Sequence, residues 1–178
     1  MTGGVAAVSS TGRLYEQLIG RVSKPARYTG GELHSITKDW EQTPLRVAIA
    51  YPDLYDLGMA NLGIAILYDI LNRRDDALCE RVFSPWTYLE GMLREHGEPL
   101  RSLETRHAVH EFDLLGITLQ YEVCFTNVLN LLDLSGIPIR TADRGDSDTL
   151  VIAGGSVSLE PEPMHAFFDA FDVTESDE

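Results

Sequence analysis

The stretch LRVAIAYPDLYDLGMANLGIAILYDILN, residues 45–72, decides the fold. Residues 45–51 form a mostly apolar run, which is typical of a strand buried on both faces. Pro52 and Asp53 end that run. Over residues 58–72 apolar side chains recur at helical spacing, which predicts a helix lying on a sheet. The stretch therefore predicts the first strand and the first crossover helix of an α/β domain.

The same alternation continues outward from this stretch. Further strands are predicted at 78–83, 112–119, 149–153 and 168–173, with helices between Pro85 and Gly97 and over 122–134. Strands that alternate with helices predict an α/β fold, a flavodoxin-like doubly wound parallel sheet in the order 2-1-3-4-5. We expect one domain over 45–173, preceded by a helical and loop extension over 1–44. Residues 1–12 are expected to be disordered, and 174–178 to form an acidic tail.

Charge and cysteine content exclude several classes of protein. The chain has 178 residues and a formal net charge of −14, which argues against binding to nucleic acid or to anionic membranes. Cys79 and Cys124 form no CxxC or CxxxCxxC spacing, so we expect two free, buried thiols and no metal site. No signal peptide or membrane-length apolar run is recognisable, so a cytoplasmic protein is expected.

Three loops should meet at the carboxyl edge of the predicted sheet, where open parallel sheets bind ligands. They cover residues 51–63, 118–122 and 153–163. Gly58 precedes the predicted helix and is a candidate anion seat, although the same residues also suit ordinary capping and turns. Neither a GxGxxG fingerprint nor a P-loop is present, and the five histidines show no HExxH or triad spacing. No catalytic residue is therefore predicted.

Five blocks carry a resemblance to a known family: KPARYTGGE (24–32), YPDLYDLGMANLGIAILYDILN (51–72), ERVFSPW (80–86), FDLLGITLQYEVCFTNVLNLLDLSGIP (112–138) and VIAGGSVSLEPEPMHAFFDAF (151–171). The chain resembles the N-terminal region of a bacterial family of B12-binding-domain radical SAM proteins of uncertain function. The resemblance implies a cobalamin-binding-type fold that precedes a radical SAM barrel, in cis or as a separate chain. The [4Fe–4S] cluster and S-adenosylmethionine belong to that barrel in the full-length family. Where the family continues with GEGE, this sequence reads TESDE (174–178), so a truncation before the core is expected.

The resemblance also implies a ligand site. The B12 signature DxHxxG reads Asp53-x-Tyr55-x-x-Gly58 here, so a tyrosine occupies the position of the histidine that ligates cobalt. The other two elements read Thr118-Leu119-Gln120 and Gly154-Gly155. Cobalamin is the implied cofactor, without histidine ligation. The residues expected to bind it are Asp53, Tyr55, Gly58, Met59, Asn61, Gly63, Thr118, Gln120, Tyr121, Glu122, Gly154 and Gly155.

The first functional hypothesis is an isolated cobalamin-binding-like domain of a radical SAM-family protein, without catalysis of its own. A second is an interaction module that binds a radical SAM partner chain and no small ligand. A third is a flavin- or nucleotide-binding domain of flavodoxin-like fold, supported by fold analogy. Because such a domain would expose apolar surface meant for a neighbouring domain, self-association is also expected.

Overall fold

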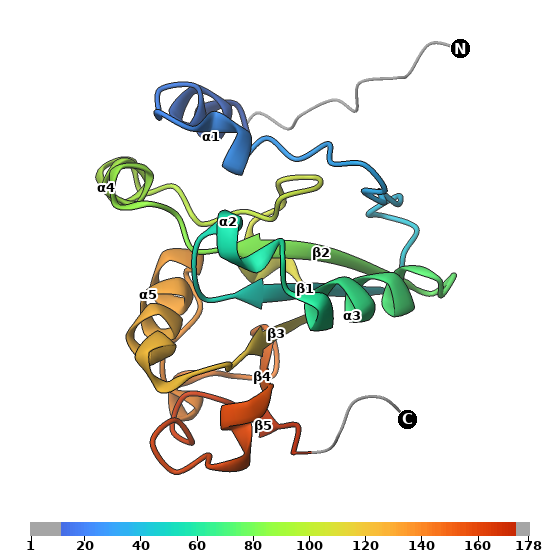
Figure 1. Ribbon diagram of the computed structural model, residues 1–178, viewed down its shortest axis with the longest axis vertical. Helices are drawn as coiled ribbons and strands as arrows, with labels where there is room; N and C mark the ends of the chain where they lie inside the picture. Colours follow the sequence, from blue (N-terminus) through green and yellow to red (C-terminus); the bar gives the residue numbers. More distant parts are fainter. Residues whose placement is uncertain (1–11, 174–178) are drawn as a thin grey trace.

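The computed structural model describes residues 12–173 and contains a five-stranded parallel sheet, whose strands are labelled in Figure 1. The strands are β1 Leu45–Tyr51, β2 Ala77–Phe83, β3 Leu114–Thr118, β4 Leu150–Gly154 and β5 Ala170–Phe171. Their order in the sheet is β2-β1-β3-β4-β5, which confirms the predicted doubly wound α/β topology. The disorder expected before Gly12 and the acidic tail expected over 174–178 lie outside the described residues.

Helices cover the two faces of this sheet unequally. The α-helices are α1 Gly12–Ile19, α2 Tyr55–Gly58, α3 Leu62–Asn72, α4 Thr87–His96 and α5 Phe125–Ser135. Short 3₁₀ segments are η1 Pro25–Arg27, η2 Val109–Glu111, η3 Glu122–Cys124, η4 Thr141–Asp143 and η5 Ser156–Leu159. Buried side chains of α1, α4 and α5 join one core with Ala48, Ala50 and Leu115. Those of α3 join a second core with Val47 and Ile49, on the opposite face of β1.

The helix predicted from Gly58 to Asn72 is interrupted. The Asn61 side chain accepts a hydrogen bond from the backbone N–H of Ile64 at 3.0 Å and caps α3, so the helix begins at Leu62. The residues before it form the separate short helix α2. Apolar spacing alone did not show this break, because a capping hydrogen bond decides where a helix starts.

Strands β3 and β4 are fully buried on one face only. Their burial alternates along the chain, whereas all seven residues of β2 are buried. Among the described residues, the connection from β4 to β5 contains the 3₁₀ segment η5 and no α-helix. Within residues 12–173, no helix therefore covers the face of β3 and β4 that lies beside α3.

The N-terminal extension is packed into the domain. Tyr15, Leu18 and Ile19 of α1 are buried in the larger core. Further on, the Tyr68 hydroxyl accepts a hydrogen bond from the backbone N–H of Ile36 at 2.8 Å, and Lys38 Nζ donates to the Ala77 carbonyl at 2.7 Å. The first contact joins the extension to α3, and the second joins it to the start of β2. The free edge of β2 is covered farther along by residues 103–105, where the Leu103 N–H donates to the Arg81 carbonyl at 2.8 Å and the Thr105 hydroxyl donates to Glu80 Oε1 at 2.7 Å, so this edge strand is completely buried.

Candidate functional site

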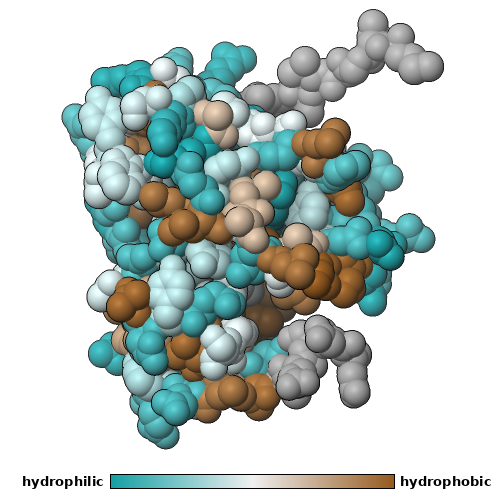
Figure 2. Space-filling model, in the orientation of Figure 1, coloured by the Kyte–Doolittle hydropathy of each residue, from teal (hydrophilic) through white to brown (hydrophobic). Residues whose placement is uncertain are grey.

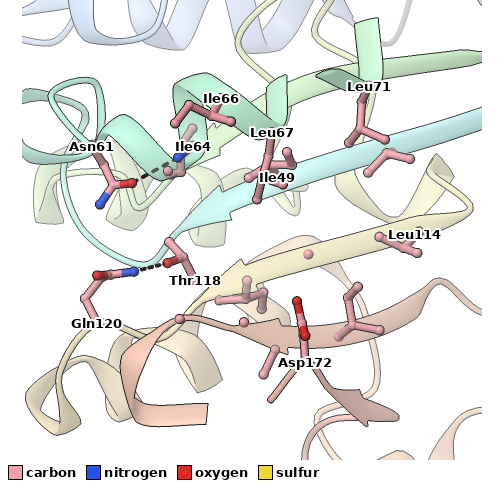
Figure 3. Close-up of a pocket in the computed structure, with 18 of the residues that line it drawn as sticks. Ile49, Asn61, Ile64, Ile66, Leu67, Leu71, Leu114, Thr118, Gln120 and Asp172 are labelled. Atoms are coloured by element: carbon pink, nitrogen blue, oxygen red, sulfur yellow. Dashed lines mark hydrogen bonds between the residues drawn. The ribbon is translucent and has the colours of Figure 1, made fainter. Parts of the chain in front are cut away.

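A long apolar groove lies between α3 and the uncovered face of β3 and β4, with a volume of about 420 Å³. Its walls are mostly apolar side chains, among them Ile64, Leu67, Leu71, Leu114 and Ile152. Figure 3 shows Asn61, Thr118 and Gln120 at one end of the groove, and Leu71 and Leu114 toward the other. The polar end lies at the carboxyl ends of β1 and β3, where the strand order reverses. Open α/β sheets bind ligands at this place.

At two glycines that line the groove, no side chain projects into it. A Cβ atom at Gly116, in the middle of β3, would meet its nearest neighbour, the Ala48 carbonyl oxygen, at 3.9 Å. At Gly154, the last residue of β4, it would meet nothing within 4 Å. Both positions thus have room for a side chain and carry none. Glycine inside a strand commonly marks a place where a ligand or another backbone approaches closely.

The polar end of the groove is held by hydrogen bonds and one special backbone conformation. Gln120 Nε2 donates to Thr118 Oγ1, and Asn61 caps α3. Gly155 has φ +103°, and a Cβ there would lie 2.7 Å from the Leu119 carbonyl oxygen. These contacts fix the two loops that follow β3 and β4. The structure thus brings together six of the predicted site residues, which are Asn61, Gly63, Thr118, Gln120, Gly154 and Gly155.

Asp53, Tyr121 and Glu122 do not line this groove. The Tyr121 hydroxyl donates to Asp53 Oδ2 at 3.0 Å, and burial together with this hydrogen bond raises the pKa of Tyr121. Asp53 Oδ1 also accepts from the backbone N–H of Leu54 at 2.7 Å. Glu122 opens η3 and is exposed. Asp53 and Tyr121 therefore tie the first loop to the second loop, beside the groove.

Tyr55, Gly58 and Met59 face the other way, toward β2. The Tyr55 hydroxyl donates to Glu32 Oε1 at 3.0 Å, and Arg81 Nη1 donates to Met59 Sδ at 3.3 Å. A Cβ at Gly58 would lie 2.4 Å from the Phe83 ring, so glycine at this position is a packing requirement. Tyr55, which the resemblance aligns with the histidine of the B12 signature, is therefore engaged outside the groove.

A buried charged cluster beneath these residues was not predicted. Arg81 Nε lies 2.6 Å from Glu104 Oε1, the Arg81 backbone N–H donates to Glu104 Oε2 at 2.8 Å, and Arg81 Nη2 lies 3.4 Å from Glu32. We call Glu32, Arg81 and Glu104 the charged cluster. The sequence offered one indication of this cluster, which is the pair of charged residues Glu80 and Arg81 within a predicted strand. Charged side chains in a buried strand need partners of opposite charge.

The charged cluster makes stability depend on pH. Burial raises the pKa of Glu104 from 4.5 to about 7, although Arg81 opposes this shift. Between these values the folded chain binds more protons than the unfolded chain, so the free energy of unfolding should fall as pH rises from about 4.5 to 7. Urea unfolding at several pH values measures this slope. Glu104→Gln should flatten it, and an unchanged slope in that variant would assign the dependence to another group.

The thiols and other potential metal ligands are dispersed. Cys79 and Cys124 are free and buried, as predicted, and burial raises the pKa of both thiols. Among residues 12–173, no three His, Cys, Asp or Glu side chains are grouped so that they could hold a metal ion. Within the same range, no helix is both long and apolar enough to cross a membrane.

The fold and the groove together define a flavodoxin-like α/β domain with an open cleft at its switch point. Residues 63–178 match the family described as "Radical SAM proteins, N-terminal", and the chain belongs to this family. This match confirms the predicted radical SAM relationship. Searches of curated proteins and of solved structures found no match.

Proposed function

We propose that this chain is a non-catalytic ligand-binding domain of a radical SAM protein, and that its ligand is cobalamin. The observation that carries the proposal is the groove beside α3, which has an apolar floor, side-chain-free glycines and a polar end at the switch point. Its volume of about 420 Å³ falls within the usual range of about 300–1,000 Å³ for ligand pockets. The radical SAM chemistry itself belongs to a core with a cysteine-bound cluster, and neither cysteine of this chain has that spacing.

The groove suits one part of cobalamin better than another. The benzimidazole nucleotide is a flat apolar group with a polar sugar and phosphate, which matches an apolar groove with Asn61, Thr118 and Gln120 at its end. The residues that line the groove include no histidine or cysteine, and Tyr55 is bonded to Glu32. The proposed mode is therefore insertion of the nucleotide without a protein ligand to cobalt. When bound, cobalamin supplies alkyl-transfer or redox chemistry, while this chain's residues hold and orient it.

Gly116→Val tests the proposal at the floor of the groove. Valine suits a strand, and a Cβ at this position meets no atom closer than 3.9 Å, so we expect the variant to fold at least as stably as the natural chain. Its side chain occupies the groove, so retention of hydroxocobalamin should fall about tenfold or more. The assay is incubation with hydroxocobalamin, desalting and a visible spectrum. Ala65→Val, on an exposed position of α3 outside the groove lining, is the matched control.

Two outcomes would contradict this reading. If the natural chain retains no corrin absorbance, cobalamin is not the ligand. If Gly116→Val retains as much as the control, the groove is not the site. Thermal shifts with flavin mononucleotide and ATP test the nucleotide-binding alternative in parallel, because a ligand that binds the folded state raises its melting temperature.

The second candidate function is docking of a radical SAM core, in cis or as a separate chain, on the carboxyl edge of the sheet. The observation that favours it is a row of exposed apolar side chains in the loops after β1 to β4. They are Leu57, Trp86, Val123 and Leu159. Co-purification of this chain with a radical SAM core, measured against Val123→Glu and Leu159→Glu variants, tests this role. An unchanged complex with both variants would remove it.

A further inference from the structure

The outer side of α3 is apolar although it faces solvent. Leu62 is 72% exposed, Ile66 42% and Ile70 50%, and these residues lie four positions apart on one side of the helix. Figure 2 shows apolar surface gathered over α3. The inner side carries the buried Ile64 and Tyr68, so the helix is apolar nearly all round. A helix of this kind is normally buried on all sides.

We call Leu62, Ile66 and Ile70 the apolar ridge of α3. It adjoins a groove of similar length on the same face of the sheet, and Ile66 also lines that groove. The helix has 11 residues and a length of about 16 Å. Strands β3 and β4 have five residues each, so the groove runs for about 16 Å. A ridge beside an equally long groove is complementary to itself under a two-fold rotation, which is the arrangement that symmetric dimers use.

We propose that a second copy of this chain occupies the groove, with α3 of each copy lying over β3 and β4 of the other. The two helices then form one layer between two sheets, and the outer side of each α3 becomes buried. Gly116 and Gly154 permit the close approach of the partner helix, because neither side chain stands in its path.

Charge and area are compatible with this dimer. The net charge of −14 repels a second copy in every orientation, so association requires a contact that is apolar and almost free of charge. The one charged residue of α3 is Asp69, which forms an ion pair with Arg73 at 2.6 Å. Half the lateral surface of such a helix is roughly 280 Å², so two helices and the sheet areas they cover bury about 1,100 Å². That value reaches the lower limit of about 1,000 Å² for specific interfaces and indicates a weak dimer.

The dimer and the proposed ligand would use the same groove, so they should compete. Hydroxocobalamin would then shift the chain toward monomers, by the reciprocity that links two equilibria at one site. This coupling rests on the proposed function, whereas the dimer of the ligand-free chain does not.

Sedimentation velocity over a concentration series up to about 100 μM tests the dimer, since weak interfaces have dissociation constants near the micromolar range. The natural chain should move from 19.8 kDa toward twice that mass. Ile70→Glu should weaken association at least tenfold. Ile70 does not line the groove, so this variant should retain hydroxocobalamin as the natural chain does. Leu159→Glu, at a residue that is 65% exposed and does not line the groove, is the matched control and should still associate.

The proposal is wrong if the natural chain stays monomeric throughout the series, or if Leu159→Glu abolishes association while Ile70→Glu does not. Gly116→Val provides a second variant, because it fills the same groove from the opposite side and should also weaken association. Circular dichroism confirms that each variant is folded. If the dimer forms and no corrin is retained, the proposed ligand fails while the dimer stands.

Discussion

Arg81→Met is expected to lower the free energy of unfolding by about 3–5 kcal/mol at pH 8, the usual cost of removing one partner from a buried ion pair. Arg81 bonds Glu104 through both its side chain and its backbone N–H, and it also reaches Glu32. The Glu104 side chain is completely buried, so without the guanidinium its carboxylate loses its counter-ion in a site that water does not reach. Urea unfolding measures the loss directly.

Two controls separate charge from packing in this experiment. The double variant Arg81→Met with Glu104→Gln removes both charges and should recover most of the lost stability. At pH 5 the loss should also be smaller, because a pKa of about 7 leaves Glu104 protonated in the folded chain. Equal losses in the single and double variants, at both pH values, would show that the lost packing of Arg81 against the Tyr68 ring is responsible instead.

Gly155→Ala is expected to cost about 3 kcal/mol or more. Gly155 has φ +103° and ψ 178°, a backbone region that is essentially restricted to glycine and that costs other residues about 1–3 kcal/mol. The added Cβ would also lie 2.7 Å from the Leu119 carbonyl oxygen. That oxygen cannot withdraw easily, because it accepts a hydrogen bond from the Val157 N–H at 3.1 Å.

The neighbouring glycine provides the control for this substitution. Gly154 has no positive φ, and a Cβ there meets nothing within 4 Å, so Gly154→Ala should change stability by less than about 0.5 kcal/mol. Thermal unfolding of the two variants side by side measures the difference. Similar melting temperatures for Gly154→Ala and Gly155→Ala would contradict the strain that we assign to Gly155.

The sheet was predictable because its strands are short apolar runs bounded by turn residues. The observed bounds of β1, Leu45–Tyr51, equal the predicted ones, since Pro52 ends the run in sequence and in space. The uncovered face of β3 and β4 was not predicted. The sequence of an apolar strand is similar whether its second face packs against a helix or borders a groove. The sequence of β3 therefore does not show that no helix covers this face.

The position of the candidate site was predictable from the sequence, but only some of the residues that line it were. The rule that ligands bind at the carboxyl edge located the groove, and the polar and glycine residues that directly follow β3 and β4 line it. The loop after β1 is longer. Some of its residues line the groove, whereas others face β2, because they contact residues that are distant in sequence. Tyr55 donates a hydrogen bond to Glu32, which lies 23 positions earlier in the sequence. The local sequence around Tyr55 does not predict such a long-range contact.

The burial of α1 against α4 has a consequence for how the chain is made. A ribosome releases Tyr15, Leu18 and Ile19 long before it has synthesised residues 87–96, so these apolar side chains leave the exit tunnel with no helix to cover them. During that interval they are an exposed segment to which a chaperone can bind. Helix α1 thus reaches its final place only after α4 has been made, and contacts between such distant segments slow folding.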